Sequence, residues 1–134
     1  MDVIVDTNIY LDYLFKRRNW KFAKKFFIDT ISCKHKILLP KTIVDELDSQ
    51  NATNDIELQI LLNLRKKKKV FFIANEKTIV SNAKKLSIQR QLPFVDCLIA
   101  LIAKEKQCII LSRDKHIYLN LADLADCFKP EDLV

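Results

Sequence analysis

Glycine does not occur anywhere in the 134 residues of this chain. A glycine-rich loop that cradles phosphate is therefore excluded, and P-loop nucleotide hydrolysis and a Rossmann-type dinucleotide site are excluded with it. Glycine is also the residue that takes left-handed backbone angles without steric cost. We therefore expect the turns of this protein to be built from Asn, Asp, Lys and Pro.

Histidine and cysteine are scarce. There are two histidines: His35 lies in a polar stretch and is predicted to be exposed, and His116 is most simply read as a surface residue. Four cysteines are scattered without a Cys-x-x-Cys pair: Cys33, Cys97, Cys108 and Cys127. This spacing argues against a zinc site or a disulfide framework, so we expect a reduced protein of the cytoplasm.

Long hydrophobic runs are also missing. No apolar stretch approaches the ~20 residues that a membrane-spanning helix needs, and the segment Met1–Val5 lacks the basic residues of a secretory signal. We therefore expect no membrane association. A length of 134 residues with 49% hydrophobic composition fits one domain, residues 1–134, with a sizeable core.

Short apolar runs alternate with longer stretches of helical periodicity. Strands are predicted at residues 2–6, 36–39, 70–73, 108–111 and 127–128. Helices are predicted over residues 8–15, 20–31, 40–48, 55–67, 76–89 and 93–104, with Pro40 and Pro93 at the first helical position. Strands separated by helices predict a parallel sheet covered on both faces. The ligand site of such a sheet lies beyond the carboxyl ends of its strands.

Four acidic residues stand where the hydrophobic pattern predicts burial. They end or interrupt the apolar segments 3–5, 43–47, 94–100 and 108–113: Asp6, Glu46, Asp96 and Asp114. An ionised carboxylate is costly to bury unless it is paired or bound to a metal. We therefore expect folding to gather the four into one pocket. Oxygen ligands without His or Cys select Mg²⁺ or Mn²⁺ over zinc, which indicates metal-dependent phosphodiester chemistry.

Each acid also has a simpler explanation. Asp6 could cap the following helix, and Asp114 could be a turn residue at a strand end. Asp96 lies in the first helical turn, where the helix dipole favours an anion. On a helical wheel Glu46 falls near the inner face and Asp45 on the far side, so Glu46 is the candidate.

Neighbouring polar residues could support these acids. Thr7 and Ser112 could donate hydrogen bonds to a carboxylate or a phosphate, although a buried structural hydroxyl is an equally good reading. Asn8 could orient Asp6 or meet a phosphate. Arg113, next to Asp114, is placed to meet a nucleic-acid strand.

The formal net charge is +6 despite these acids, and a basic protein favours contact with a phosphate backbone. The basic segments are Lys16-Arg17-Arg18 and Arg65-Lys66-Lys67-Lys68-Lys69. A solvated surface is the commoner meaning of such runs, with RNA contact as the alternative.

The ordered motifs resemble those of the PIN-domain ribonucleases, and of their VapC-like toxin branch in particular. The matching segments are residues 5–9, 44–47, 95–100 and 111–115, and the ending Pro130-Glu131-Asp132-Leu133 is similar to the usual tail of that branch. The resemblance implies a three-layer α/β/α sandwich with a central parallel sheet. It implies Mg²⁺- or Mn²⁺-dependent RNA cleavage, with Asp6, Glu46, Asp96 and Asp114 as catalytic and metal-binding residues. It also implies an antitoxin protein as partner and a homodimer.

Several alternatives stay open at this point. Many members carry a further acid where this chain has His116, so one or two metal ions are both compatible with the sequence. A stand-alone nuclease of RNA processing or quality control would use the same residues. A catalytically silent RNA- or protein-binding module is the alternative of another class. A phosphotransfer protein fits less well, because Asn8 stands where an aspartyl phosphatase needs an acid.

Overall fold

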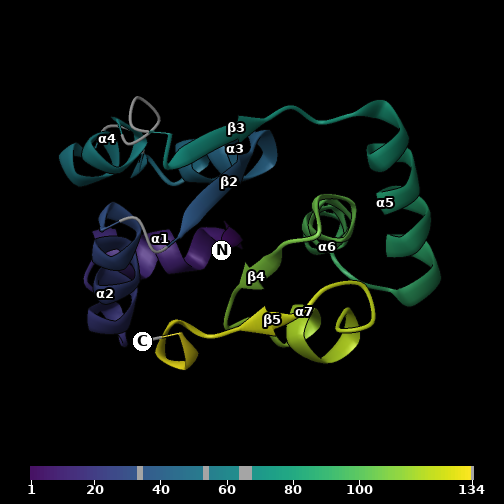
Figure 1. The fold of residues 1–134 in the computed structure, drawn as a ribbon. Coiled ribbons are helices and arrows are strands. Elements are labelled where there is room, and N and C mark those ends of the chain that lie inside the picture. The colour runs from purple at the N-terminus through teal and green to yellow at the C-terminus, as the bar shows by residue number, and fades with distance from the viewer. Residues whose placement is uncertain (33–34, 53–54, 64–67, 134) are drawn as a thin grey trace.

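The computed structural model describes residues 1–32, 35–52, 55–63 and 68–133 (Figure 1). The strands are β1 (Asp2–Val5), β2 (Lys36–Pro40), β3 (Val70–Ile73), β4 (Ile109–Leu111) and β5 (Cys127–Phe128). The helices are α1 (Thr7–Leu14), α2 (Trp20–Ile31), α3 (Lys41–Ser49), α4 (Ile56–Leu62), α5 (Lys77–Arg90), α6 (Phe94–Lys106) and α7 (Lys115–Asn120). A 3-10 turn, η3 (Pro130–Asp132), follows β5.

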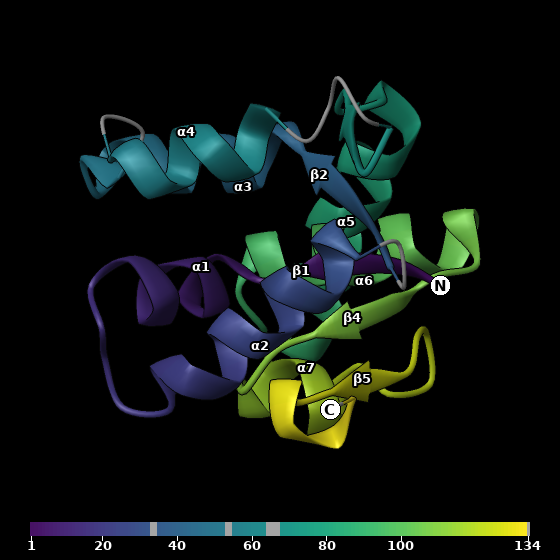
Figure 2. The ribbon, with the colours of Figure 1, turned by 60° about the vertical axis from the view of Figure 1, so that its left-hand side comes forward.

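The five strands form one parallel sheet in the order β3-β2-β1-β4-β5. Helix α2 lies on one face of the sheet, and α5 and α6 lie on the other (Figures 1 and 2). The turn η3 near the C-terminus packs against α2. The predicted α/β class and three-layer α/β/α sandwich are thereby confirmed.

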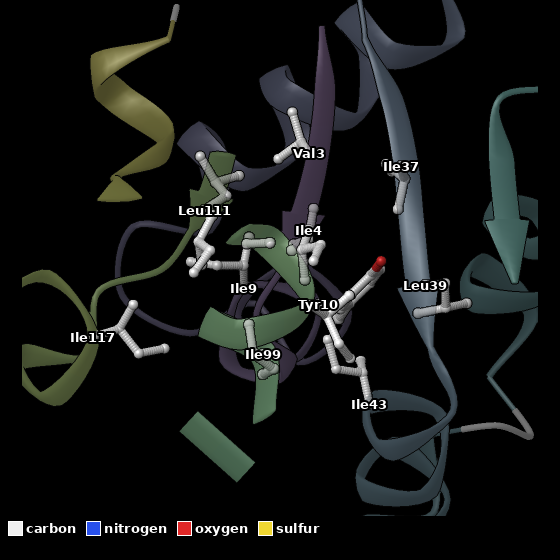
Figure 3. Packing of buried hydrophobic residues seen from close by; sticks show 14 of the residues in the cluster. Val3, Ile4, Ile9, Tyr10, Ile37, Leu39, Ile43, Ile99, Leu111 and Ile117 are labelled. Carbon is white, nitrogen blue, oxygen red and sulfur yellow. The ribbon is translucent and has the colours of Figure 1, made fainter. Parts of the chain in front are cut away.

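The core explains why β1 is apolar on both of its faces. Val3, Ile4 and Val5 are successive residues, so they point alternately to the two faces, and all three are fully buried. Ile9 of α1 and Ile99 of α6 are also fully buried (Figure 3). A strand covered on both faces reads as a continuous hydrophobic run, which is the pattern that predicted β1.

Most element boundaries agree with the sequence to within two residues, but the two prolines were placed wrongly. Pro40 is the last residue of β2 and caps α3, and Pro93 caps α6. Both have extended ψ angles, 146° and 137°, so neither is the first helical residue. The predicted helix over residues 55–67 is seen as α4, and residues 64–67 lie outside the described part of the chain.

The prediction that His35 is exposed was wrong. Its side chain is buried and stacks on Phe26 of α2, with 5.1 Å between the ring centroids. His35 directly precedes β2, and the backbone N–H of Lys36 donates to the carbonyl of Met1 at 2.8 Å. The pairing of β2 with β1 therefore carries His35 against α2, a tertiary contact that the polarity of its sequence neighbours does not reveal.

The absence of glycine leaves ordinary residues in left-handed conformations. Among the described residues, six non-glycine positions have positive φ: Lys16, Asn19, Asn51, Lys68, Gln91 and Gln107. Gln91 ends α5 and Gln107 ends α6, both at the position where helices favour glycine. The expectation of Asn and Lys in turns is met, and glutamine at helix ends was not foreseen.

Replacing Gln107 with glycine should therefore stabilise the protein. A left-handed residue with a Cβ costs about 1–2 kcal/mol, and the extra chain entropy of glycine returns about 0.5–1 kcal/mol of that. We expect Gln107→Gly to raise the free energy of unfolding by about 0.5–1 kcal/mol, measured by urea denaturation. The control is Gln89→Gly inside α5, which should lower stability. A loss of stability in both variants would contradict this account of the α6 terminus.

Candidate active site

Two neighbouring parallel strands end at the same edge of the sheet, and each is followed by a polar residue. Val5 at the end of β1 pairs with Leu111 at the end of β4. Asp6 and Ser112 therefore follow their strands side by side, and the Ser112 hydroxyl donates to Oδ2 of Asp6 at 2.8 Å. Ser112 is fully buried and Asp6 is 5% exposed. The Asp6 carboxylate makes no helix-capping hydrogen bond, so the simple cap explanation does not account for it.

This pair lies where the order of the sheet reverses. The chain passes from β1 to β2 and β3 on one side of β1, and β4 and β5 lie on its other side. In an open parallel sheet, ligands usually bind at such a switch point, outside the carboxyl ends of the strands. The Asp6–Ser112 pair therefore lies at the position where a sheet of this order usually binds its ligand.

Asp114 is tied to the same hydroxyl. Its backbone N–H donates to Oγ of Ser112 at 3.0 Å. Its carboxylate caps α7 by accepting from the backbone N–H of His116 at 2.9 Å. Asp114 is therefore a turn residue at a strand end, as its simpler explanation stated. Because the cap uses only one carboxylate oxygen, the other oxygen can still face the pocket.

Glu46 reaches the site from α3, the helix that follows β2. The hydroxyl of Thr7 donates to its Oε1 at 2.8 Å. The adjacent Asp45 points to solvent and pairs with Lys41 at 3.0 Å. The two acids thus lie as the helical wheel predicted.

Asp96 reaches the site from the first turn of α6 and is 8% exposed. Its burial and the charge of the neighbouring Asp114 both raise its pKa. Cys97, Leu98, Ile99 and Ala100, which follow it, are all buried. This packing fixes the start of α6 against the sheet and holds Asp96 at the edge of the core.

The four acids line one pocket of about 150 Å³. Its lining residues are Asp6, Thr7, Asn8, Leu11, Glu46, Ser49, Gln50, Asp96 and Asp114. Leu11, Ser49 and Gln50 were not foreseen. The signal that could have found them is helical spacing, because Leu11 lies four residues after Thr7, and Ser49 and Gln50 lie three and four residues after Glu46.

The pocket carries more negative charge than it can stabilise by itself. Burial raises the pKa of Asp6 to about 6, against the Ser112 hydrogen bond that lowers it, and the charges of Glu46 and Asp114 add to the rise. Burial also raises the pKa of Asp96 to about 7, with further increases from the charges of Asp114, Asp6 and Glu46. A cation in the pocket would reverse this repulsion.

The donor set fits a hard divalent cation that keeps part of its water shell. In the described part of the chain no group of three or more His, Cys, Asp or Glu side chains is arranged to hold a metal ion directly. Mg²⁺ usually binds one or two carboxylates and retains several waters. The two buried, repelling carboxyl groups of Asp6 and Asp96 match that requirement better than a closed protein cage.

Arg113 and His116 lie outside the lining of this pocket. The guanidinium of Arg113 donates two hydrogen bonds to the carboxylate of Glu131 and lies 3.9 Å from Asp12. These contacts tie η3 and α1 to the end of β4, and the contact of Arg113 with a nucleic-acid strand stays a prediction. The side chain of His116 is exposed, in keeping with its reading as a surface residue.

Of the two basic segments, only the first is fully described. Lys16, Arg17 and Arg18 are exposed in the loop between α1 and α2. In the second segment Lys68 is exposed and Lys69 is half-buried, and Arg65, Lys66 and Lys67 lie outside the described residues.

Cys97 and Cys108 are buried, Cys127 is half-buried, and all three are free thiols. Cys33 lies outside the described residues. Within the described residues, no helix has the length and apolar character to cross a bilayer.

Comparisons with known proteins agree with this fold. The family model for the PIN domain matches residues 3–123. No curated protein sequence matches the chain.

Three similar solved structures each align over 96% of this chain. A toxin–antitoxin complex from Klebsiella pneumoniae is 16% identical over 97% of its chain, with a TM-score of 0.64. VapBC2 from Rickettsia felis, bound to a promoter DNA fragment, is 13% identical over 98%, with a TM-score of 0.67. FitAcB from Neisseria gonorrhoeae is 17% identical over 98%, with a TM-score of 0.59.

Proposed function

This chain belongs to the PIN-domain family, and from that premise we propose that it is a metal-dependent ribonuclease that hydrolyses RNA phosphodiester bonds at the carboxylate pocket. One observation carries the proposal: four acids from four separate segments line one pocket at the switch point of the sheet. A structural role does not require four mutually repelling carboxylates. A divalent cation bound among them would offset that repulsion and would attract the phosphate group of a substrate.

We assign the metal to Asp6 and Asp96, the two most buried acids of the pocket. Mg²⁺ or Mn²⁺ bound there would lower the pKa of a coordinated water and offset the negative charge of the scissile phosphate. Glu46 and Asp114 are half-buried at the same pocket. Their carboxylates are placed to hold waters of the metal shell or to accept the proton of the attacking water.

The neighbouring polar groups position these acids. Ser112 fixes the Asp6 carboxylate and Thr7 fixes Glu46, each through a hydrogen bond of 2.8 Å. Such contacts orient a metal ligand and restrict its rotamers. Asn8 is exposed at the pocket, where its side-chain amide could donate to a phosphate oxygen of the substrate.

We further propose that the protein is the toxin of a toxin–antitoxin pair that acts in the cytoplasm as a homodimer. The support is the fold, because solved structures of this fold include a toxin–antitoxin complex and VapBC2. The partner would be an antitoxin that covers the carboxylate pocket. A stand-alone nuclease of RNA processing would share the chemistry and lack that partner.

The test is cleavage of a panel of structured and single-stranded RNAs by purified protein with Mg²⁺, with Mn²⁺ and with EDTA. We expect cleavage with either metal, none with EDTA, and none of DNA strands of the same sequences. Folded protein that cuts no RNA with either metal would favour a catalytically silent binding module and contradict the proposal.

A further inference from the structure

A second hollow lies away from the carboxylates, at the loop between α1 and α2 and the start of α2. It has a volume of about 480 Å³ and is lined by residues 16–22 alone, which include no acid. We propose that this loop is a second RNA-binding site, which holds single-stranded substrate by stacking a base on Trp20 and pairing its phosphates with the surrounding Lys and Arg. The inference rests on the proposed ribonuclease function and extends it to the recognition of the strand.

The charge of this region has one sign. Residues 13–28 contain six basic residues and no Asp or Glu: Lys16, Arg17, Arg18, Lys21, Lys24 and Lys25. All six are exposed. A concentration of positive charge on one loop and the first turns of one helix is the electrostatic pattern of a phosphate-binding surface.

Aromatic rings are interleaved with these cations. The ammonium groups of Lys16 and Lys24 lie 5.7 and 5.8 Å from the ring centroid of Trp20. The guanidinium carbon of Arg17 lies 5.8 Å from the ring of Phe15, which is 46% exposed. Basic grooves combined with aromatic stacking platforms are how proteins hold single-stranded nucleic acid without reading its sequence.

The lysines over Trp20 are compatible with a stacked base. A cation–π contact at an exposed site is weaker than the stacking of a base on tryptophan. An incoming base can therefore displace one ammonium group from the ring. The displaced lysine remains beside the phosphate that accompanies the base, so its charge contributes to binding in the new arrangement.

Helix α1 joins this site to the carboxylate pocket. Thr7 and Asn8 at its N-terminus, and Leu11 one turn later, line the pocket. The loop of residues 15–19 follows its C-terminus, and an eight-residue helix is about 12 Å long. The loop projects on the side of the molecule opposite the N-terminus (Figure 2). A strand of a few nucleotides could thus occupy both sites.

The single tryptophan of the chain gives a direct readout. In EDTA, which prevents metal-dependent cleavage, a short single-stranded oligouridylate should quench Trp20 fluorescence, and an RNA duplex of equal length should quench it much less. Absence of quenching by the single strand would overturn the proposal. Quenching by a polyglutamate peptide and not by RNA would assign the hollow to an acidic protein segment, and would also overturn it.

Variants separate stacking from charge, using anisotropy of labelled RNA over a salt series. Trp20→Ala should weaken binding at least about 5-fold with an unchanged salt slope, and Trp20→Phe should restore most of the affinity. Arg17→Gln with Arg18→Gln should reduce the slope of log K against log salt by about 1.4. Lys84→Gln with Lys85→Gln on α5 removes the same charge and should change little. Equal losses of RNA affinity in the two double charge variants would contradict an RNA-binding site at this loop. Wild-type RNA affinity in Trp20→Ala would contradict it as well.

Failure of this inference is distinguishable from failure of the proposed function. RNA binding at Trp20 in EDTA does not depend on cleavage. Metal-dependent cleavage by a protein whose Trp20 is unaffected by RNA would retain the ribonuclease and overturn the second site. Quenching of Trp20 fluorescence by RNA, without RNA cleavage under any condition, would retain the second site and overturn the ribonuclease.

Discussion

Replacing Asp96 with asparagine is expected to reduce metal-dependent RNA cleavage by at least about 100-fold. Removing a hydrogen-bond partner of a metal ligand already costs about 10–100-fold in many metalloenzymes, and Asp96 is assigned here as a ligand itself. The amide keeps the size of the carboxyl group and removes its charge. Because the metal-free pocket suffers from charge repulsion, the variant should remain folded. The measurement is the initial rate of cleavage of one RNA in Mg²⁺ and in Mn²⁺, with circular dichroism as the check of the fold.

The matched control for this variant is Asp45→Asn. Asp45 is exposed and directly precedes Glu46, but it pairs with Lys41 at the surface and does not line the pocket. The Asp45→Asn variant should cleave RNA at nearly the wild-type rate. Asp6→Asn should behave as Asp96→Asn does. Undiminished cleavage by both Asp6→Asn and Asp96→Asn would remove the carboxylate pocket from the mechanism.

The metal-free protein is expected to become more stable as the pH falls from 7.5 to 5.5. The pKa values of Asp6 and Asp96 are raised in the folded state to about 6 and about 7, from 3.8. Between pH 4 and pH 7 the native state therefore binds more protons than the unfolded state, and stability falls as pH rises through this window. The midpoint of thermal unfolding in EDTA should accordingly be several degrees higher at pH 5.5.

Two further measurements of thermal unfolding test the cause of this pH dependence. Asp96→Asn should unfold at a higher temperature than wild type at pH 7.5 in EDTA, and its midpoint should change less with pH. Mg²⁺ should raise the midpoint of wild type at pH 7.5, because a ligand that binds only the native state stabilises it, and should raise that of Asp96→Asn much less. The same pH dependence in both proteins would show that these carboxyl groups are not its source.

The position of Asp6 and Ser112 could be predicted from the sequence because it depends on strand ends. Two apolar runs end in polar residues, and parallel pairing of those strands places the residues together, as the 2.8 Å hydrogen bond shows. The choice of Glu46 over Asp45 followed from helical periodicity in the same way. Features that follow from the regular repeat of a strand or a helix could therefore be predicted from the sequence.

Features that depend on contacts between side chains far apart in the sequence could not be predicted in this way. The ion pairs of Arg113 with Glu131 of η3 and Asp12 of α1 were not foreseen. His35 lies in a polar stretch, yet it stacks on Phe26. The hollow at Trp20 depends on the path of the loop after α1, where Lys16 and Asn19 take left-handed angles. Local polarity and periodicity carry no information about such contacts.

Anomalous diffraction from crystals of the protein soaked in Mn²⁺ would reveal whether the carboxylate pocket binds metal. We propose that Asp6, Glu46, Asp96 and Asp114, brought together from four segments, form a site for a divalent cation. We expect an anomalous peak at the manganese edge within this pocket, in contact with Asp6 or Asp96 and absent from Asp96→Asn crystals. A fully ordered, empty pocket at millimolar Mn²⁺, with manganese bound elsewhere or nowhere, would contradict it.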